Sequence, residues 1–110
     1  MAKTYTLNIY DEEVIIQLKK TEYETGHLAI IMENWDEEYK YFGEWDTLTT
    51  NFPMIKSGDG CVFIQKDKYL DFVLKNNLGV PTLREVQSGF NTYAEVLLNK
   101  EVLNEMEKLE

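Results

Sequence analysis

The sequence predicts a single α+β domain, with an antiparallel sheet of five or six strands, one packed helix and a C-terminal helix. Three observations lead to this prediction. Apolar and polar residues alternate near the N-terminus, and apolar residues take helical spacing from residue 68 to 78. The chain has 110 residues, 44% of them hydrophobic, which suits one domain (residues 1–110) with a real core.

Residues 1–50 are predicted to form an antiparallel meander. From Lys3 to Tyr10 the residues Tyr5, Leu7 and Ile9 share one face, which is the period of a half-buried strand. Later segments rich in β-branched and aromatic residues predict three more strands, joined by short polar turns. The predicted strands are 3–10, 14–23, 28–32 and 39–45, with turns at 11–13, 25–26 and 34–38.

The middle of the chain predicts a short strand and then a helix. The strand covers residues 61–64, after a loop at 57–60. Asp67 is expected to cap a helix over 68–78, in which Gly79 is the left-handed residue after the end and Pro81 prevents continuation. The buried side of this helix is expected to hold Tyr69, Leu70, Val73 and Leu74.

The C-terminal third allows two interpretations. Thr92 to Glu95 fits a capping box that would begin one helix reaching Leu109. That helix would place Val96 and Leu103 opposite its other apolar residues. We therefore prefer a strand over 92–98 and then a helical tail over 100–110, with Asn99 as the cap. The tail is expected to bury Val102, Leu103, Met106 and Leu109.

Residue types that support catalysis are scarce. His27 is the single histidine, and Cys61 is the single cysteine, so neither a zinc site nor an internal disulfide is expected. The glycine-rich loop at 58–60 is not followed by a phosphate-binding motif, and the basic residues are dispersed. The sequence predicts no enzyme activity, no cofactor, no metal, no membrane segment, no direct nucleic-acid binding and a cytoplasmic location.

The acidic residues are concentrated in one third of the chain. The net charge is −9, and residues 21–55 hold eight acidic residues against Lys40 alone. Within this segment, carboxylates alternate with aromatic residues. The alternation fits a sheet with a core face and a solvated acidic face, and it also fits an interface for an arginine-rich partner. The candidate partner-binding residues are Glu33, Trp35, Asp36, Glu37, Glu38, Tyr39, Glu44, Trp45 and Asp46.

Four short motifs carry a family resemblance from Leu48 onward. They are Leu-Thr-Thr-Asn-Phe-Pro at 48–53, Cys-Val-Phe-Ile at 61–64, Asn-Asn-Leu-Gly-Val-Pro-Thr at 76–82 and Gln-Ser-Gly-Phe-Asn-Thr-Tyr at 87–93. With them the chain resembles a family of uncharacterised small proteins carried by conjugative elements and phages of Gram-positive bacteria. Family members commonly have proline where this chain has Ala94. They also generally end soon after the last motif, so residues 100–110 are expected to be an addition.

Small acidic proteins of such mobile elements are similar to type II-A anti-CRISPR inhibitors. The resemblance therefore implies a non-enzymatic protein that binds an RNA-guided Cas nuclease and blocks guide-RNA loading or DNA engagement. A Cas nuclease holds its heteroduplex in a positively charged channel, which an acidic domain can occupy as a nucleic-acid mimic. Two alternatives stay open: an accessory or regulatory binding protein with another host target, and a small nuclease that degrades the guide.

Overall fold

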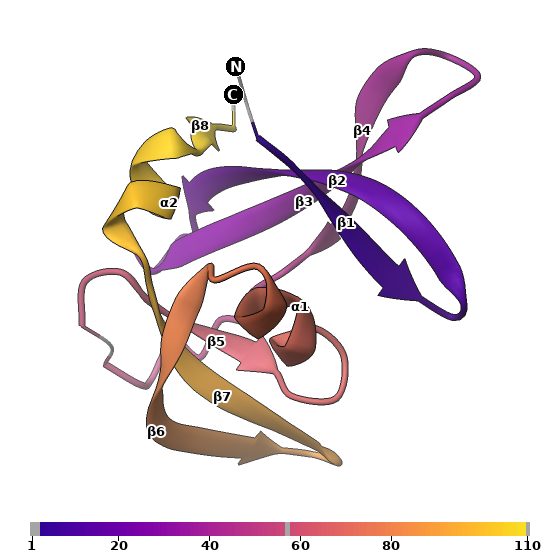
Figure 1. Ribbon diagram of the computed structural model, residues 1–110. Coiled ribbons are helices and arrows are strands. Elements are labelled where there is room, and N and C mark those ends of the chain that lie inside the picture. The colour runs from indigo at the N-terminus through magenta and orange to yellow at the C-terminus, as the bar shows by residue number, and fades with distance from the viewer. Residues whose placement is uncertain (1–2, 57, 110) are drawn as a thin grey trace.

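Two mainly antiparallel sheets pack around one shared core, and a short helix lies between them (Figure 1). The computed structural model describes residues 3–56 and 58–109. The elements in chain order are β1 (Thr4–Ile9), β2 (Glu12–Glu22), β3 (Leu28–Asp36), β4 (Tyr41–Thr47), β5 (Cys61–Gln65), α1 (Leu70–Lys75), β6 (Gly79–Ser88), β7 (Asn91–Leu98), α2 (Lys100–Glu105) and β8 (Glu107–Lys108). The α+β class is confirmed. The first sheet has five strands, as predicted, but among the described residues three further strands form a second sheet that the sequence did not predict.

The first sheet contains the predicted meander, in the order β1-β2-β3-β4, and β8 adds a parallel pair to β2. The alternation in β1 is confirmed, since Tyr5 and Leu7 are buried and their neighbours are exposed. The predicted loop at 34–38 is too long on its N-terminal side. β3 continues to Asp36, because the ladder extends through Trp35 paired with Phe42.

The second sheet has the order β5-β7-β6 and faces the first across the core. The chain crosses between the sheets at Leu48, whose amide donates to the Ile30 carbonyl at 2.9 Å. The strand predicted at 61–64 is confirmed as β5. The largest fully buried side chains come from both sheets and from the segment around α1: Ile16, Ile30, Met32, Ile64, Val73, Leu78 and Val96.

Helix α1 is shorter than the predicted helix over 68–78. Tyr69 occupies the N-cap position, and Asp67 does not cap the helix. Val73 is fully buried, as predicted, but Leu74 is 41% exposed and Phe72 is buried in its place. Because Phe72 and Val73 face the core, Leu74 lies almost opposite Phe72 around the helix and faces solvent.

The helix ends in a different way from the one the sequence predicts. Asn77, with φ +53°, takes the left-handed conformation that was expected at Gly79. Gly79 instead begins β6, a strand that the sequence did not predict. A β-carbon at Gly79 would lie 2.5 Å from the Leu97 carbonyl oxygen of β7. This position needs glycine because the two backbones approach closely.

The strand at 92–98 is confirmed as β7, but the C-terminal tail is only partly helical. α2 ends at Glu105, and the chain then runs beside β2 as β8, where the Leu109 amide donates to the Lys20 carbonyl at 2.9 Å. Met106 is buried at this change of direction. The prediction of a helix over 100–110 is therefore wrong for residues 106–109, and Glu110 lies outside the described residues.

We expect Gly79→Ala to lower the free energy of unfolding by about 2 kcal/mol, because its methyl group would press on the β7 backbone. Gly58→Ala is the matched control, since a β-carbon there would meet only the Cys61 sulfur at 3.9 Å. Urea denaturation of both variants measures the difference. Equal stability of the two variants would contradict the close approach.

Candidate protein-binding surface

The β3–β4 hairpin projects from the body of the molecule (Figure 1). Asp36 shapes its turn: one carboxylate oxygen accepts hydrogen bonds from the backbone amides of Glu38 at 2.9 Å and Tyr39 at 3.1 Å. The Asp36 carbonyl accepts a third bond, from the Lys40 amide at 2.8 Å. Asp36 therefore acts within the turn, although the sequence placed it among the partner-binding residues.

Aromatic rings line both strands near this turn. Trp35 packs on Phe42 with ring centroids 5.1 Å apart, and Tyr39 meets Tyr41 edge-on at 6.5 Å. The side chain of Tyr41 lies against Gly43, where a β-carbon would be 3.2 Å from the ring. Tyr39 is 70% exposed and Tyr41 is 53% exposed. Large apolar surface thus faces solvent beside charged groups.

The carboxylates of the turn are held in place but remain accessible. Glu37 accepts hydrogen bonds from the Lys40 ammonium and from the Trp35 indole, the latter at 2.6 Å. These bonds lower the pKa of Glu37, the one from Lys40 having the larger effect. Glu38 and Glu44 are exposed and form no ion pair with any residue that the structure describes.

The base of the hairpin serves structural roles. Glu33 accepts a hydrogen bond from Gln17 at 2.7 Å and lies 3.8 Å from the Lys19 ammonium. A register shift after Met32 leaves Trp45 unpaired with β3, and its side chain packs against the core. Glu44 pairs with Glu33 and so also lies at the base. Of the nine predicted residues, four therefore lie away from the projecting tip: Glu33, Glu44, Trp45 and Asp46.

Asp46 connects the hairpin to the segment that leads into α1. Its carboxylate accepts hydrogen bonds from the Tyr69 hydroxyl and from the Lys68 ammonium, which is 3.2 Å away. Burial would raise the pKa of Asp46, but the hydrogen bonds outweigh burial and hold that pKa below its usual value. Burial first, and then the bond to Asp46, raise the pKa of Tyr69.

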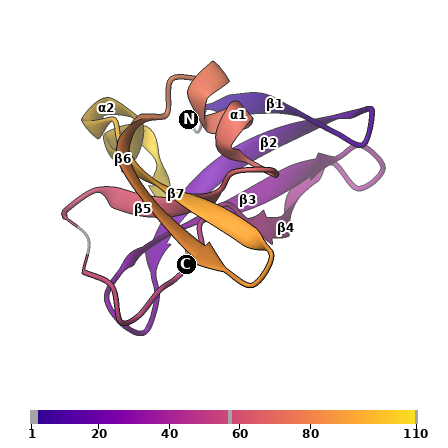
Figure 2. The same cartoon turned by 90° about the horizontal axis from the view of Figure 1, so that it is seen from below.

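A second turn lies at the same end of the first sheet. Tyr10 and Asp11 both have positive φ and form the β1–β2 turn, and Tyr10 is 89% exposed. In an antiparallel meander alternate turns share one end of the sheet, and both views place this turn on the same side as the β3–β4 turn (Figure 1 and Figure 2). We call the two turns together, residues 10–13 and 35–41, the acidic end.

The acidic end combines residues that the sequence did not bring together. Residues 10–13 and 35–41 contain six carboxylates and one cationic side chain, that of Lys40. The sequence predicted a turn at 11–13, but neither these residues nor Tyr10 were among the predicted partner-binding residues. The signal available was the antiparallel order itself, which places the first and third turns at the same end of the sheet. By contrast, Glu22 and Glu24 lie at the opposite end, so the charge of residues 21–55 does not form one surface.

His27 and Cys61 line one small cavity of about 10 Å³. The His27 Nδ1 atom lies 2.9 Å from the Asn51 side-chain oxygen. Burial first, and then the nearby Glu95 carboxylate, raise the pKa of the Cys61 thiol, which favours the less reactive protonated form. Among the described residues, no group of three or more potential ligands is placed to hold a metal ion, and no helix is long and apolar enough to cross a membrane.

A family model described as a domain of unknown function, DUF4313, matches residues 16–109. The chain belongs to this family. The match begins within β2 and includes the β3–β4 hairpin, whereas β1 and its turn lie outside it. It also reaches Leu109, so this family model includes most of the C-terminal tail. That residues 100–110 are an addition relative to the mobile-element family stays a prediction. No curated protein and no solved structure matches the chain.

We expect Tyr69→Phe to lower the free energy of unfolding by about 1 kcal/mol at pH 7, because a partly exposed charged hydrogen bond is lost. The low pKa of Asp46 adds stability that is fully present above the unfolded-state pKa of about 4 and is lost as pH falls through the folded-state pKa. Urea unfolding at pH 7 and pH 3 should therefore show the parent and the variant converging in acid. A difference of the same size at both pH values would contradict this role of Asp46.

Proposed function

We propose that this protein is a non-enzymatic inhibitor that binds a basic surface of a partner protein through its acidic end. The observation that carries the proposal is the exposure of Tyr39 and Tyr41 beside Glu37 and Glu38 on a projecting hairpin. An isolated domain gains nothing from these rings in solvent, whereas tyrosine is a frequent anchor in protein interfaces.

The two kinds of side chain contribute differently to binding. Carboxylates of one sign attract a basic partner from a distance and raise the association rate. Tyrosine rings act after contact, because they lose water against the partner and slow dissociation. The hydrogen bonds of Asp36 hold the turn in one conformation, which lowers the entropy lost on binding.

An RNA-guided type II-A Cas nuclease of a Gram-positive host is the partner that the resemblance implies, and it is the partner we propose. Its channel for guide and target is strongly basic, so a projecting acidic hairpin is complementary in shape and in charge. Occupying that channel would block guide-RNA loading or DNA engagement. We place this action in the cytoplasm of the bacterial host, where the single free cysteine would stay reduced.

Titration against purified Cas nuclease tests the proposal directly. The nuclease is held at a fixed concentration far above the expected dissociation constant, and DNA cleavage is measured as the protein is added. We expect inhibition to be complete near one equivalent. Treating the protein with a chelator, before magnesium is supplied to the nuclease, should leave the inhibition unchanged. Inhibition far below one equivalent, with shortened guide RNA, would instead establish the guide-degrading nuclease. No effect at several equivalents would direct attention to another host target.

We expect the double variant Glu37→Lys/Glu38→Lys to associate with the nuclease about tenfold more slowly at low salt, since it reverses two charges of the acidic end. The variant retains Asp36, so the turn should form as before. The difference should shrink as salt rises, because exposed charges are screened beyond about 8 Å at physiological ionic strength.

The control for this experiment is Glu22→Lys/Glu24→Lys, which changes the net charge equally at the opposite end of the sheet. Association rates for both variants come from stopped-flow or surface-based kinetics over a salt series. Equal slowing of the two would assign the effect to net charge and remove the acidic end from the interface.

A further inference from the structure

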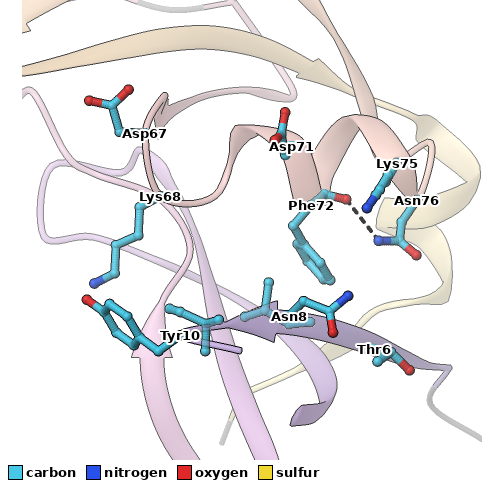
Figure 3. A pocket seen from close by; sticks show the side chains of 11 residues that line it. Thr6, Asn8, Tyr10, Asp67, Lys68, Asp71, Phe72, Lys75 and Asn76 are labelled. Atoms are coloured by element: carbon cyan, nitrogen blue, oxygen red, sulfur yellow. Dashed lines mark hydrogen bonds between the residues drawn. The ribbon is translucent and has the colours of Figure 1, made fainter. Parts of the chain in front are cut away.

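A polar groove of about 380 Å³ runs between strand β1 and helix α1. Five consecutive residues of β1 and its turn, from Thr6 to Tyr10, form one wall (Figure 3). Asp67, Lys68, Asp71 and Lys75 lie along the other wall. Because successive residues of β1 point to opposite faces of the sheet, a groove lined by all five must follow the edge of the strand.

This edge of β1 is unpaired. β2 is the only strand that pairs with β1, and in the described residues no other backbone or side-chain hydrogen bond reaches the β1 backbone. The outward amides and carbonyls of an edge strand are a template for a further strand. A groove flanked by an edge strand and a helix is also a geometry in which extended peptides add to a sheet.

The other sheet edges carry features that oppose strand addition. β4 has the charged residues Glu44 and Asp46 and a register shift, and β6 has Pro81 and a second register shift. The edge of β5 receives a bridge from Thr50. The β1 segment Thr-Tyr-Thr-Leu-Asn-Ile has no charge, no proline and no bulge. Of these edges, β1 alone has no charge, proline, bulge or bridge within the strand itself, although α1 lies beside it.

We propose that this groove binds an extended basic segment of a partner protein, which adds as an antiparallel strand along β1. Helix α1 forms the far wall of the groove, so the edge of a whole sheet, as a second copy of this chain would present, would meet the helix. Residues Thr6 to Tyr10 offer about 15 Å of edge, the length of about five extended residues.

The charges around the groove determine the chemistry of the segment. Asp67, Asp71 and Lys75 form no ion pair among the described residues, whereas Lys68 is already paired with Asp46. Lys75 lies near Thr6, at the end of the groove away from Tyr10 (Figure 3). At Tyr10 the groove opens toward Asp11, Glu12 and Glu13. An antiparallel strand would place its N-terminal residues there, so lysine or arginine in those positions is favoured. This inference goes beyond the proposed function and does not depend on a Cas nuclease.

The test uses a seven-residue synthetic peptide, two arginines followed by alternating valine and threonine with an amidated C-terminus, titrated into isotope-labelled protein. We expect the largest amide shifts, and slowed hydrogen exchange, in Thr4–Ile9, with β4 unchanged. A second peptide with proline at alternate positions should not bind, because it lacks the amides that pair with β1. Millimolar peptide without any change in β1, or equal binding of the proline peptide, would overturn the inference.

A pair of protein variants isolates the groove wall. Asp71→Lys should weaken binding of the peptide on the order of fivefold, because it repels the arginines. Glu101→Lys is the matched control, since Glu101 occupies the same first-turn position in the other six-residue helix. Weakening by both variants to the same degree would show net-charge attraction and overturn binding in the groove.

Discussion

The hydrogen bond from Tyr69 to Asp46 links strand β4 of the projecting hairpin to helix α1, and the positions of both proposed surfaces depend on this link. Asp46 is the penultimate residue of β4, and Tyr69 immediately precedes α1. The bond therefore fixes the base of the projecting hairpin and the position of the helix that walls the groove. Its surroundings are half-buried, which raises the cost of leaving either partner unsatisfied. Both proposed surfaces would lose their geometry if this link were free to move.

The exposed aromatic residues follow a pattern that core packing does not explain. Three of the turns between neighbouring strands expose an aromatic residue: Tyr10 in the first, Tyr39 in the third and Phe90 between β6 and β7. Tyr23, in the second turn, is instead half-buried and bonds to Thr49. Phe90 has no acidic neighbours comparable to those of Tyr10 and Tyr39, which is why the acidic end, and not the β6–β7 turn, is the better candidate for a basic partner. Leu83 lies in β6 of the same β6–β7 hairpin. It is 93% exposed and has φ +75°, so its backbone is strained, but this strain does not identify a ligand.

The sequence predicted those strands whose apolar residues form a recognisable pattern. β1 buries one face, so alternation was sufficient to find it, whereas β5 and β7 bury consecutive residues on both faces and were found as short apolar runs. β6 is exposed along almost its whole length and contains Pro81, so it carries no such signal. The helix was predicted too long because local spacing cannot show that Asn76 and Asn77 end it. In the candidate site, Trp35 and Trp45 look alike in sequence. A register shift, which depends on long-range pairing, sends only Trp45 against the core.

The acidic end and the β1 groove meet at Tyr10, which belongs to both. A partner segment lying along β1 with its basic residues toward Tyr10 would bring its preceding residues over the carboxylates at 11–13. Electrostatic attraction at the acidic end and backbone pairing in the groove are then two stages of one binding event, the first setting the association rate and the second the lifetime. The two stages differ in their physical dependence, since screening by salt weakens attraction between exposed charges much more than it weakens strand pairing. A complex that forms slowly in high salt but dissociates at an unchanged rate would have this origin.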